Sequence, residues 1–177
     1  MVPSYNFPIG TSRKDPAFSR IVRIINGFRG YDSLDDLKAA DAQVRETLAR
    51  LMSKTRTEMD QAIKLIDRGD HPAVLPEFHD MITHVNKAIY RLSRPTIQKI
   101  TTCKVYTPME DAVGKIYNLD FQMLSDAESI SRLMREFQRI DHEEDSIRSN
   151  IIKITMAARD IPLCLDEKEE LIACMIS

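Results

Sequence analysis

Apolar side chains recur every three or four residues along most of this chain, which is the spacing of one face of an α-helix. The pattern is cleanest in two long stretches without glycine or proline, residues 31–68 and 115–161. A shorter stretch of the same kind covers residues 77–94. Because glycine and proline are the strongest breakers of regular structure, these stretches predict the helical body of the protein.

The first part of the pattern predicts an antiparallel helical hairpin over residues 32–94. Asp32 or Ser33 can cap the first helix at its N-terminus. Arg68 and Gly69 suit its end, since a cation favours the last turn and glycine favours the position after it.

The second arm of the hairpin starts after a short connection in which Asp70 can act as a cap and Pro72 can occupy the first turn. Its apolar residues follow in alternating steps of three and four: Leu75, Phe78, Ile82, Val85, Ile89 and Leu92. A connection this short requires antiparallel helices. We expect Pro95 to kink the arm, because Ile97 and Ile100 continue its stripe.

A further helical region begins at Thr107 and Pro108, a cap followed by a proline in the first helical position. Apolar residues spaced three and four positions apart then continue over residues 109–158. This region forms either one long bent helix or two helices, with the joint near residues 118–128 or near residues 141–146.

Pro162 is expected to stop this region, and residues 166–176 to form a short acidic amphipathic helix. The predicted fold is therefore all-α, with a long antiparallel hairpin plus further helices packed as an elongated bundle. We divide the chain into a flexible basic segment with a short amphipathic helix (1–30), the hairpin and bundle (31–162) and the acidic C-terminal helix (163–177).

The charge distribution adds a functional hint to this fold. The formal net charge is only −2, but residues 1–105 carry 17 basic and 12 acidic side chains, a balance of +5. Residues 106–177 carry 8 basic and 15 acidic side chains, a balance of −7. Opposite charges favour docking of the two halves, and salt weakens that attraction.

Residues 16–28 form a basic amphipathic segment that could lie in a membrane interface, apolar face down and arginines near anionic headgroups. The alternative is a short helix that covers the end of the hairpin core. The candidate membrane-binding residues are Arg13, Lys14, Phe18, Arg20, Ile21, Val22, Arg23, Ile25, Phe28 and Arg29.

No catalytic motif, metal-binding motif or cofactor fingerprint occurs, and we expect no catalytic residue, metal or cofactor. Two alternatives concern the histidines. Asp80, His84, His142 and Asp145 could meet as a metal site in a helical bundle. His84 followed by Lys87 resembles the phosphate-accepting pattern of histidine phosphotransfer domains. The simpler interpretation of all these residues is a solvated polar face.

The cysteines Cys103, Cys164 and Cys174 are odd in number and fit no metal ribbon, which predicts reduced thiols in the cytoplasm. The N-terminus does not resemble a signal peptide, and no window approaches the length of a membrane span. Basic and acidic residues alternate along the hairpin, and no aromatic stacking platform is visible. We therefore do not expect nucleic acid as a partner.

The order of a basic N-terminal segment, a long hairpin and an acidic helical half resembles the ESCRT-III family, including its archaeal CdvB-like members. Residues 62–70 resemble the end of the family's first helix, where Gly-Asp follows a basic stretch. Residues 82–93, with Asn86, Lys87 and Ile89, resemble its second helix, and the likeness covers residues 16–150.

The resemblance implies a membrane-remodelling subunit of cell division that switches between a closed monomer and an open polymer. It also implies a C-terminal motif for an ATPase, and the residues in that place are Ile161, Pro162, Leu163, Leu165, Leu171 and Met175. We predict a non-enzymatic scaffold, cytoplasmic or peripheral at a membrane, whose acidic half is autoinhibitory and whose partners are itself and helical proteins. The alternatives are an adaptor bundle with a dedicated partner, or the phosphotransfer or metal-binding bundle.

Overall fold

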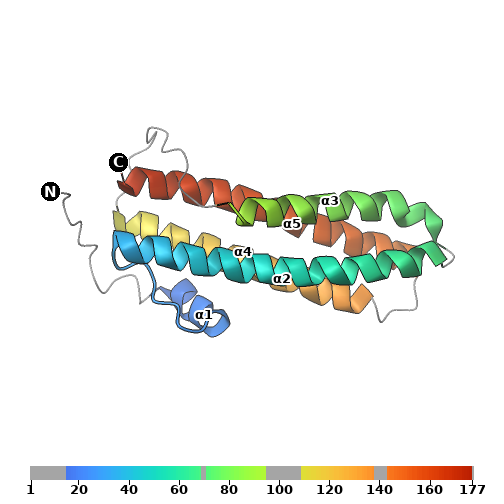
Figure 1. The fold of residues 1–177 in the computed structure, drawn as a ribbon, viewed down its shortest axis with the longest axis horizontal. Helices are drawn as coiled ribbons and strands as arrows, with labels where there is room; N and C mark the ends of the chain where they lie inside the picture. The colour runs from blue at the N-terminus through green and yellow to red at the C-terminus, as the bar shows by residue number, and fades with distance from the viewer. Residues whose placement is uncertain (1–14, 69–70, 95–108, 138–142, 177) are drawn as a thin grey trace.

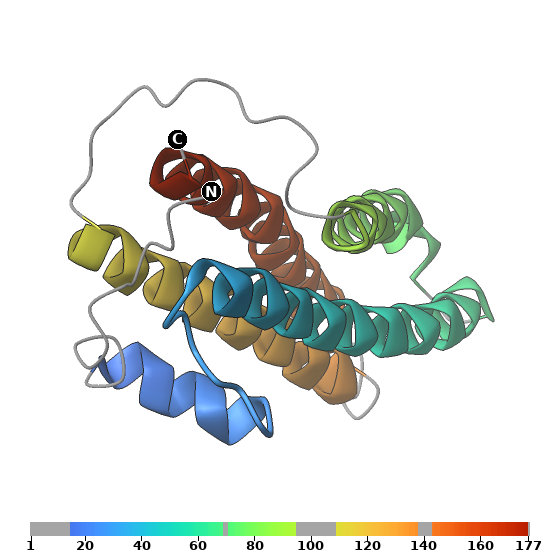
Figure 2. The ribbon, with the colours of Figure 1, turned by 60° about the vertical axis from the view of Figure 1, so that its left-hand side comes forward.

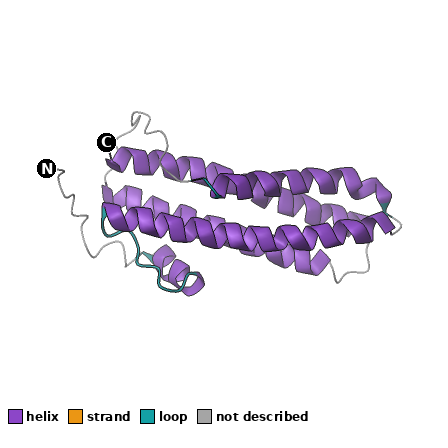
Figure 3. Ribbon diagram, in the orientation of Figure 1, coloured by secondary structure: helices purple, strands orange, loops and turns teal. Residues whose placement is uncertain are grey.

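The computed structural model describes residues 15–68, 71–94, 109–137 and 143–176, and within these ranges every regular element is helical (Figure 3). In chain order the elements are α1 (Pro16–Ile24), α2 (Leu34–Arg68), the short 3₁₀ helix η2 (Pro72–Val74), α3 (Leu75–Leu92), α4 (Met109–Phe137) and α5 (Glu144–Ile176). The predicted all-α fold is confirmed.

Helices α2, α3, α5 and α4 form an elongated bundle in that order around its axis, because each packs on the next and α4 packs on α2 (Figures 1 and 2). α2 and α3 run antiparallel, which confirms the predicted hairpin, and α4 and α5 form a second antiparallel pair. α3 is the shortest of the four, with 18 residues against 35 in α2. It therefore covers only the half of the bundle in which α2 ends.

Local chemistry explains where the hairpin helices begin. Ser33 is the cap of α2: its hydroxyl oxygen accepts a hydrogen bond from the Asp36 N–H at 3.1 Å, and the Asp36 carboxylate accepts one from the hydroxyl at 2.5 Å. This reciprocal pair satisfies one of the free N–H groups at the helix start. Pro72 begins η2 rather than α3. The proposed cap Asp70 and the kink at Pro95 lie outside the described residues.

The second helical region is two helices, of which the first ends at Phe137 and the second begins at Glu144. This agrees with a joint near residues 141–146 and excludes one near 118–128, which lies inside α4. The Phe137 ring at the end of α4 packs against Phe78 of α3, with ring centroids 5.6 Å apart. Apolar stripes of all four helices meet in one continuous core.

The prediction that Pro162 ends a helix is wrong, because α5 continues through it to Ile176. An interior proline removes one backbone hydrogen bond and costs about 3 kcal/mol. Leu165 and Ile172 lie beyond it and are buried in the core. Each such side chain contributes about 1.5–3 kcal/mol when fully buried, so packing offsets the defect. The acidic segment of residues 166–176 is the end of α5 rather than a separate helix.

α1 covers the outer side of α4, next to the start of α2 (Figure 2). Asp15 caps it, accepting a hydrogen bond from the Ala17 N–H at 2.7 Å. Phe18, Phe28, Tyr31 and Tyr117 form an aromatic cluster between α1 and α4, with ring centroids 4.8 to 6.3 Å apart.

The turn between α1 and α2 depends on Gly30, which has a positive φ of 88°. A Cβ atom there would lie 2.6 Å from the Tyr117 hydroxyl oxygen, closer than any side chain tolerates. The hydroxyl in turn accepts a hydrogen bond from the Tyr31 N–H at 2.9 Å. Glycine at this position therefore lets Tyr117 hold the turn directly against α4.

The cysteines differ from the prediction. Cys174, near the end of α5, is disulfide-bonded, so the expectation that all thiols are reduced is wrong for this residue. Cys164 is a free, buried thiol. Burial, followed by the nearby Asp126 carboxylate, raises its pKa to about 11, which makes it a poor nucleophile. Cys103 lies outside the described residues.

Candidate functional site: a buried ion cluster

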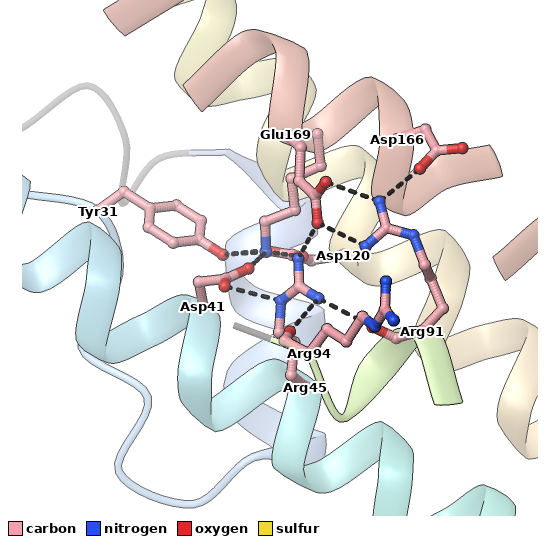
Figure 4. Close-up of polar contacts among 9 residues, drawn as sticks. Tyr31, Asp41, Arg45, Arg91, Arg94, Asp120, Asp166 and Glu169 are labelled. Atoms are coloured by element: carbon pink, nitrogen blue, oxygen red, sulfur yellow. Dashed lines mark hydrogen bonds and ion pairs between the residues drawn. The ribbon is translucent and has the colours of Figure 1, made fainter. Parts of the chain in front are cut away.

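Charged and polar groups meet at the level where α3 ends, with a buried centre inside the bundle and a rim that reaches the surface (Figure 4). They come from the turn before α2 and from all four bundle helices. We call them the ion cluster, and its members are Tyr31, Asp41, Arg45, Arg91, Arg94, Asp120, Asp166, Lys168 and Glu169. A cluster of this kind is a departure from an apolar core, because buried charges are rare unless they are paired.

Lys168 of α5 is the centre of the cluster, and neither it nor Asp120 of α4 has any exposed surface. The Lys168 Nζ lies 2.5 Å from Asp120 Oδ1 and 2.7 Å from Asp41 Oδ1 of α2. It also donates a hydrogen bond to the Tyr31 hydroxyl at 3.3 Å, and that hydroxyl donates to the other oxygen of Asp120. One ammonium group thus joins α2, α4, α5 and the turn before α2.

The electrostatics of this centre follow from burial. Burial raises the pKa of Asp120 above its ordinary value, although the ion pair with Lys168 and the hydrogen bond from Tyr31 act in the opposite direction. Burial, followed by the Asp120 charge, raises the pKa of Tyr31 well above its usual range. Tyr31 therefore stays a protonated donor at physiological pH, which is what its bond to Asp120 requires.

Arg45 of α2 extends the cluster to the end of α3. Its Nε donates to Asp41 Oδ2 at 2.9 Å, and its Nη2 donates to Glu169 Oε1 at 2.8 Å. Its Nη1 donates to the backbone carbonyls of Arg94 at 3.1 Å and Arg91 at 3.5 Å. The last carbonyls of a helix lack intrahelical partners, so Arg45 caps α3 from inside the protein.

At the rim of the cluster, the Arg91 guanidinium of α3 contacts two acids of α5, an arrangement that we call the rim fork. The Arg91 Nη2 lies 2.6 Å from Asp166 Oδ1 and 2.7 Å from Glu169 Oε2, and its Nη1 lies 3.1 Å from Glu169 Oε1. The hydrogen bonds that Arg91 donates to Glu169 are the main reason why the pKa of Arg91 is raised. These contacts join the basic hairpin to the acidic end of the chain.

The predicted membrane-binding residues do not share one face. Ile21, Ile25 and Phe28 are buried and Phe18 packs in the aromatic cluster, so the apolar side of α1 is covered by α4. This is the alternative arrangement, a helix that covers the core. The exposed residues of the set are Val22 and the cations Arg20, Arg23 and Arg29, and Arg13 and Lys14 lie outside the described residues.

The predicted partner-binding residues also divide. Ile161 and Leu165 are in the core, and Pro162, Leu171 and Met175 are partly buried. Leu163 is the exception, with 64% of its surface exposed. The segment therefore presents one apolar side chain to a partner rather than six.

The histidine alternatives gain no support from the geometry. His84 Nε2 lies 3.6 Å from Asp80 Oδ2 in a contact within α3, and His142 is outside the described ranges. Among the residues that the structure describes, no three potential metal ligands come together.

Asp126 of α4 is a half-buried acid outside the ion cluster, and it makes stability depend on pH. Its Oδ2 is buried without a hydrogen-bond partner among the described residues, and burial, then Asp160, raises its pKa from 3.8 to about 6. The folded protein therefore holds this proton more tightly than the unfolded chain does. The contribution of Asp126 to the free energy of unfolding is complete at pH values below the pKa that this residue has in the unfolded chain. It is lost as the pH rises through the pKa that Asp126 has in the folded protein.

We therefore expect Asp126→Asn to stabilise the protein by about 1 kcal/mol near neutral pH, where the wild type carries a half-buried carboxylate whose Oδ2 has no hydrogen-bond partner among the described residues. The difference should disappear near pH 4. Urea unfolding of both proteins across this pH range is the measurement. Asp160→Asn is the control and should have a smaller effect in the same direction. A benefit of Asp126→Asn that does not change with pH would contradict the assignment.

The fold and the cluster together define the protein as an elongated all-α bundle closed by buried ion pairs. Comparisons with models of known protein families, with curated proteins and with solved structures found no match. Along the described parts of the chain, no helix is both long enough and apolar enough to span a membrane.

Proposed function

We propose that this protein is a non-enzymatic helical scaffold that assembles with copies of itself or with helical partners, and that the described bundle is its closed state. The observation that carries the proposal is the set of ion pairs from Arg45 and Arg91 of the hairpin to Asp166 and Glu169 of α5. They are the contacts that the opposite charges of the two halves predict. The cluster centre supports a structural role, because Lys168 and Asp120 offer no surface to a substrate.

The part of α5 beyond Pro162 is the element that we propose opens. Pro162 has no N–H, so the helical hydrogen-bond ladder is interrupted there and bending costs less. Beyond it, Leu165 and Ile172 are buried and contribute several kcal/mol between them, about 3–6 by area. Partly exposed ion pairs contribute about 1 kcal/mol each. Packing and the buried ion pairs of Lys168 therefore hold the segment closed, and the ion pairs of Arg91 adjust how often it opens.

The test is Arg91→Ala, which removes the rim fork without leaving a fully buried charge unpaired. We expect the fraction of molecules in which α5 is open beyond Pro162 to rise roughly fivefold. The loss of an ion pair worth about 1 kcal/mol changes the opening equilibrium by that factor. Self-assembly, followed by sedimentation velocity and electron microscopy, should then begin at lower protein concentration than in the wild type, and added salt should shift the wild type in the same direction.

Arg132→Ala is the matched control for this test. Arg132 is an exposed arginine that, like the partly buried Arg91, forms an ion pair, but its partner Glu136 lies on the same helix, one turn away. It should leave assembly unchanged. If Arg91→Ala and wild type assemble equally, or if neither assembles at any concentration, the proposed closure by α5 is wrong and an adaptor for a dedicated partner becomes the better account.

We further propose that the scaffold acts as a membrane-remodelling polymer subunit of the kind that the ESCRT-III resemblance implies. The cations Arg20 and Arg23 of α1 and Arg29 of the turn that follows it support this part, since all three are exposed. The Arg20 guanidinium also lies over the ring of Phe121 of α4, 4.9 Å from its centroid. With the apolar face covered, binding in the closed state is electrostatic, about 1 kcal/mol per cation near an anionic surface.

Replacing all three arginines with alanine should therefore abolish co-sedimentation with vesicles that contain phosphatidylserine. Replacement of three exposed hairpin cations, Lys54, Lys64 and Lys87, is the control with the same change in net charge. Equal binding by both triple variants, or no salt-sensitive binding by the wild type, would reject the membrane role while leaving the scaffold proposal intact.

The cytoplasmic face of a membrane is the location that this proposal requires. The disulfide bond at Cys174 argues against a cytoplasmic location, because such bonds persist mainly in oxidising compartments. Mass spectrometry after rapid alkylation of whole cells decides between the two. A reduced Cys174 supports the cytoplasmic location, and an oxidised one excludes the cytoplasm as the site of action.

A further inference from the structure

The disulfide bond at Cys174 lies in the last turn of α5, within the segment beyond Pro162 that we propose opens. The sequence has three cysteines, and the other one in α5, Cys164, is a free thiol. The bond therefore joins the last turn of α5 to a cysteine outside this helix. Residues 163–173 are thus held at both ends, by the helix before Pro162 and by a covalent bond.

Cys174 lies beyond the well-packed part of α5. Ile172 is the last buried residue of this helix, and Ala173, Cys174 and Met175 are only partly buried. The last turn also contains no cation to interact favourably with the helix dipole. Helix ends with few buried contacts are the parts of a protein that open at the lowest free energy. The disulfide therefore restrains the end of α5 from which opening would begin.

A covalent bond at this position opposes the opening of α5 more strongly than the rim fork does. If α5 bends at Pro162, the segment beyond it moves away from the bundle, and a bonded Cys174 cannot follow without its partner. A cross-link disfavours an expanded state because it removes most of the conformations of that state. The typical effect of a disulfide is larger than that of a partly exposed ion pair.

The surroundings of the disulfide determine what can break it. Cys174 is partly exposed, so a thiolate from solution can reach its sulfur. The free Cys164 cannot act as that thiolate, because it lies about 15 Å away along the helix axis. Burial also raises the pKa of Cys164 to about 11, which keeps it a thiol at neutral pH. The reductant must therefore come from outside the protein.

We propose that the disulfide at Cys174 is a redox switch: it holds the acidic end of α5 closed, and reduction by an external dithiol releases it. The dithiol attacks one sulfur, the S–S bond breaks, and two electrons and two protons pass to Cys174 and its partner while the dithiol becomes a disulfide. The inference rests on the proposed scaffold function and names its regulation. Because the bond and the rim fork act on the same opening, the fivefold effect of Arg91→Ala applies to the reduced protein.

The test is hydrogen exchange of residues 163–172 in the full chain, oxidised and after reduction with dithiothreitol at the same pH. We expect reduction to accelerate exchange in this segment at least about tenfold and to leave α4 unchanged. Cys174→Ser, a substitution at a partly exposed position, should exchange as fast as the reduced wild type with or without reductant.

Cys164→Ala is the matched control, because it removes the free thiol of α5 and leaves the disulfide in place. Its exchange should accelerate on reduction by the same factor as that of the wild type. Equal exchange in the oxidised wild type and in Cys174→Ser would overturn the redox switch.

Sedimentation velocity of the same samples, and of Arg91→Ala in both redox states, separates this inference from the scaffold proposal. Assembly that is stronger after reduction supports both. Assembly that is equal in the two redox states would overturn the redox switch and leave the scaffold proposal standing. Faster exchange after reduction, with every sample monomeric, would support the redox switch and overturn the scaffold proposal.

Discussion

Replacing Lys168 with methionine is expected to lower the free energy of unfolding by about 3–5 kcal/mol, a large part of the stability of a domain of this size. Methionine matches the length of the lysine stem, so the loss does not come from a cavity. It comes from Asp120 and Asp41, which would keep buried negative charges without the ammonium group that lies 2.5 and 2.7 Å from them. Urea unfolding followed by circular dichroism measures the loss.

A second substitution distinguishes this explanation from simple loss of packing. Asp120→Asn removes one of the two orphaned charges and still accepts the Tyr31 hydrogen bond. We expect the double variant Lys168→Met, Asp120→Asn to be more stable than Lys168→Met alone. Removing both charges of a buried ion pair costs less stability than removing one charge and leaving the other unpaired. Strictly additive losses would contradict the electrostatic account of the cluster.

The second large effect is expected from Arg45→Met, which should destabilise the protein by about 2–3 kcal/mol. The methionine keeps the apolar stem, but the Arg94 carbonyl just after α3 loses the donor that Arg45 supplies, the Arg91 carbonyl keeps only its backbone donors, and Glu169 loses one of its two cations. Asp41 retains Lys168, which is why the loss is smaller than that of Lys168→Met. Amide exchange in the last turn of α3 should accelerate more than exchange elsewhere in the bundle.

Arg50→Met is the control, because Arg50 is exposed on the same helix. Substitutions at exposed positions without special contacts usually change stability by less than about 0.5 kcal/mol. If both variants lose the same small amount, then Arg45 does not cap α3 in solution.

The helices could be predicted because their signals are local. The steps of three and four along α3 coincide with its buried residues Phe78, Ile82, Val85 and Leu92, and the Ser33 cap follows from its own hydroxyl. The joint between α4 and α5 was one of two alternatives in the sequence. The break in the stripe at residues 141–146 was the better signal, since acidic residues there cannot continue an apolar face.

Pro162 shows where local signals fail. A proline inside a helical pattern normally ends the helix, but here the apolar positions Ile161, Leu165 and Ile172 continue the stripe on both sides of it. Tertiary packing overrides the local preference when the buried area beyond the proline is large enough. The continuing stripe was visible in the sequence, and it outweighed the proline.

The ion cluster could not be assembled from sequence, because members in direct contact are up to 137 residues apart. A signal existed for its members one at a time. Asp41, Asp120 and Lys168 each occupy a helix position that the apolar stripe assigns to the core, and a charged residue there requires a buried partner. Which acid meets which cation depends on how the helices pack, and that is not a local property of the chain.

The central claim is that the ion pairs from Arg91 of the hairpin to Asp166 and Glu169 of α5 adjust how often the acidic end of the chain opens. Hydrogen exchange of the amides in residues 163–175, compared between Arg91→Ala and wild type, tests it most directly. The account predicts exchange roughly fivefold faster beyond Pro162 in the variant, with α4 unchanged. Equal exchange rates in this segment, or an acceleration spread evenly over the whole bundle, would contradict it.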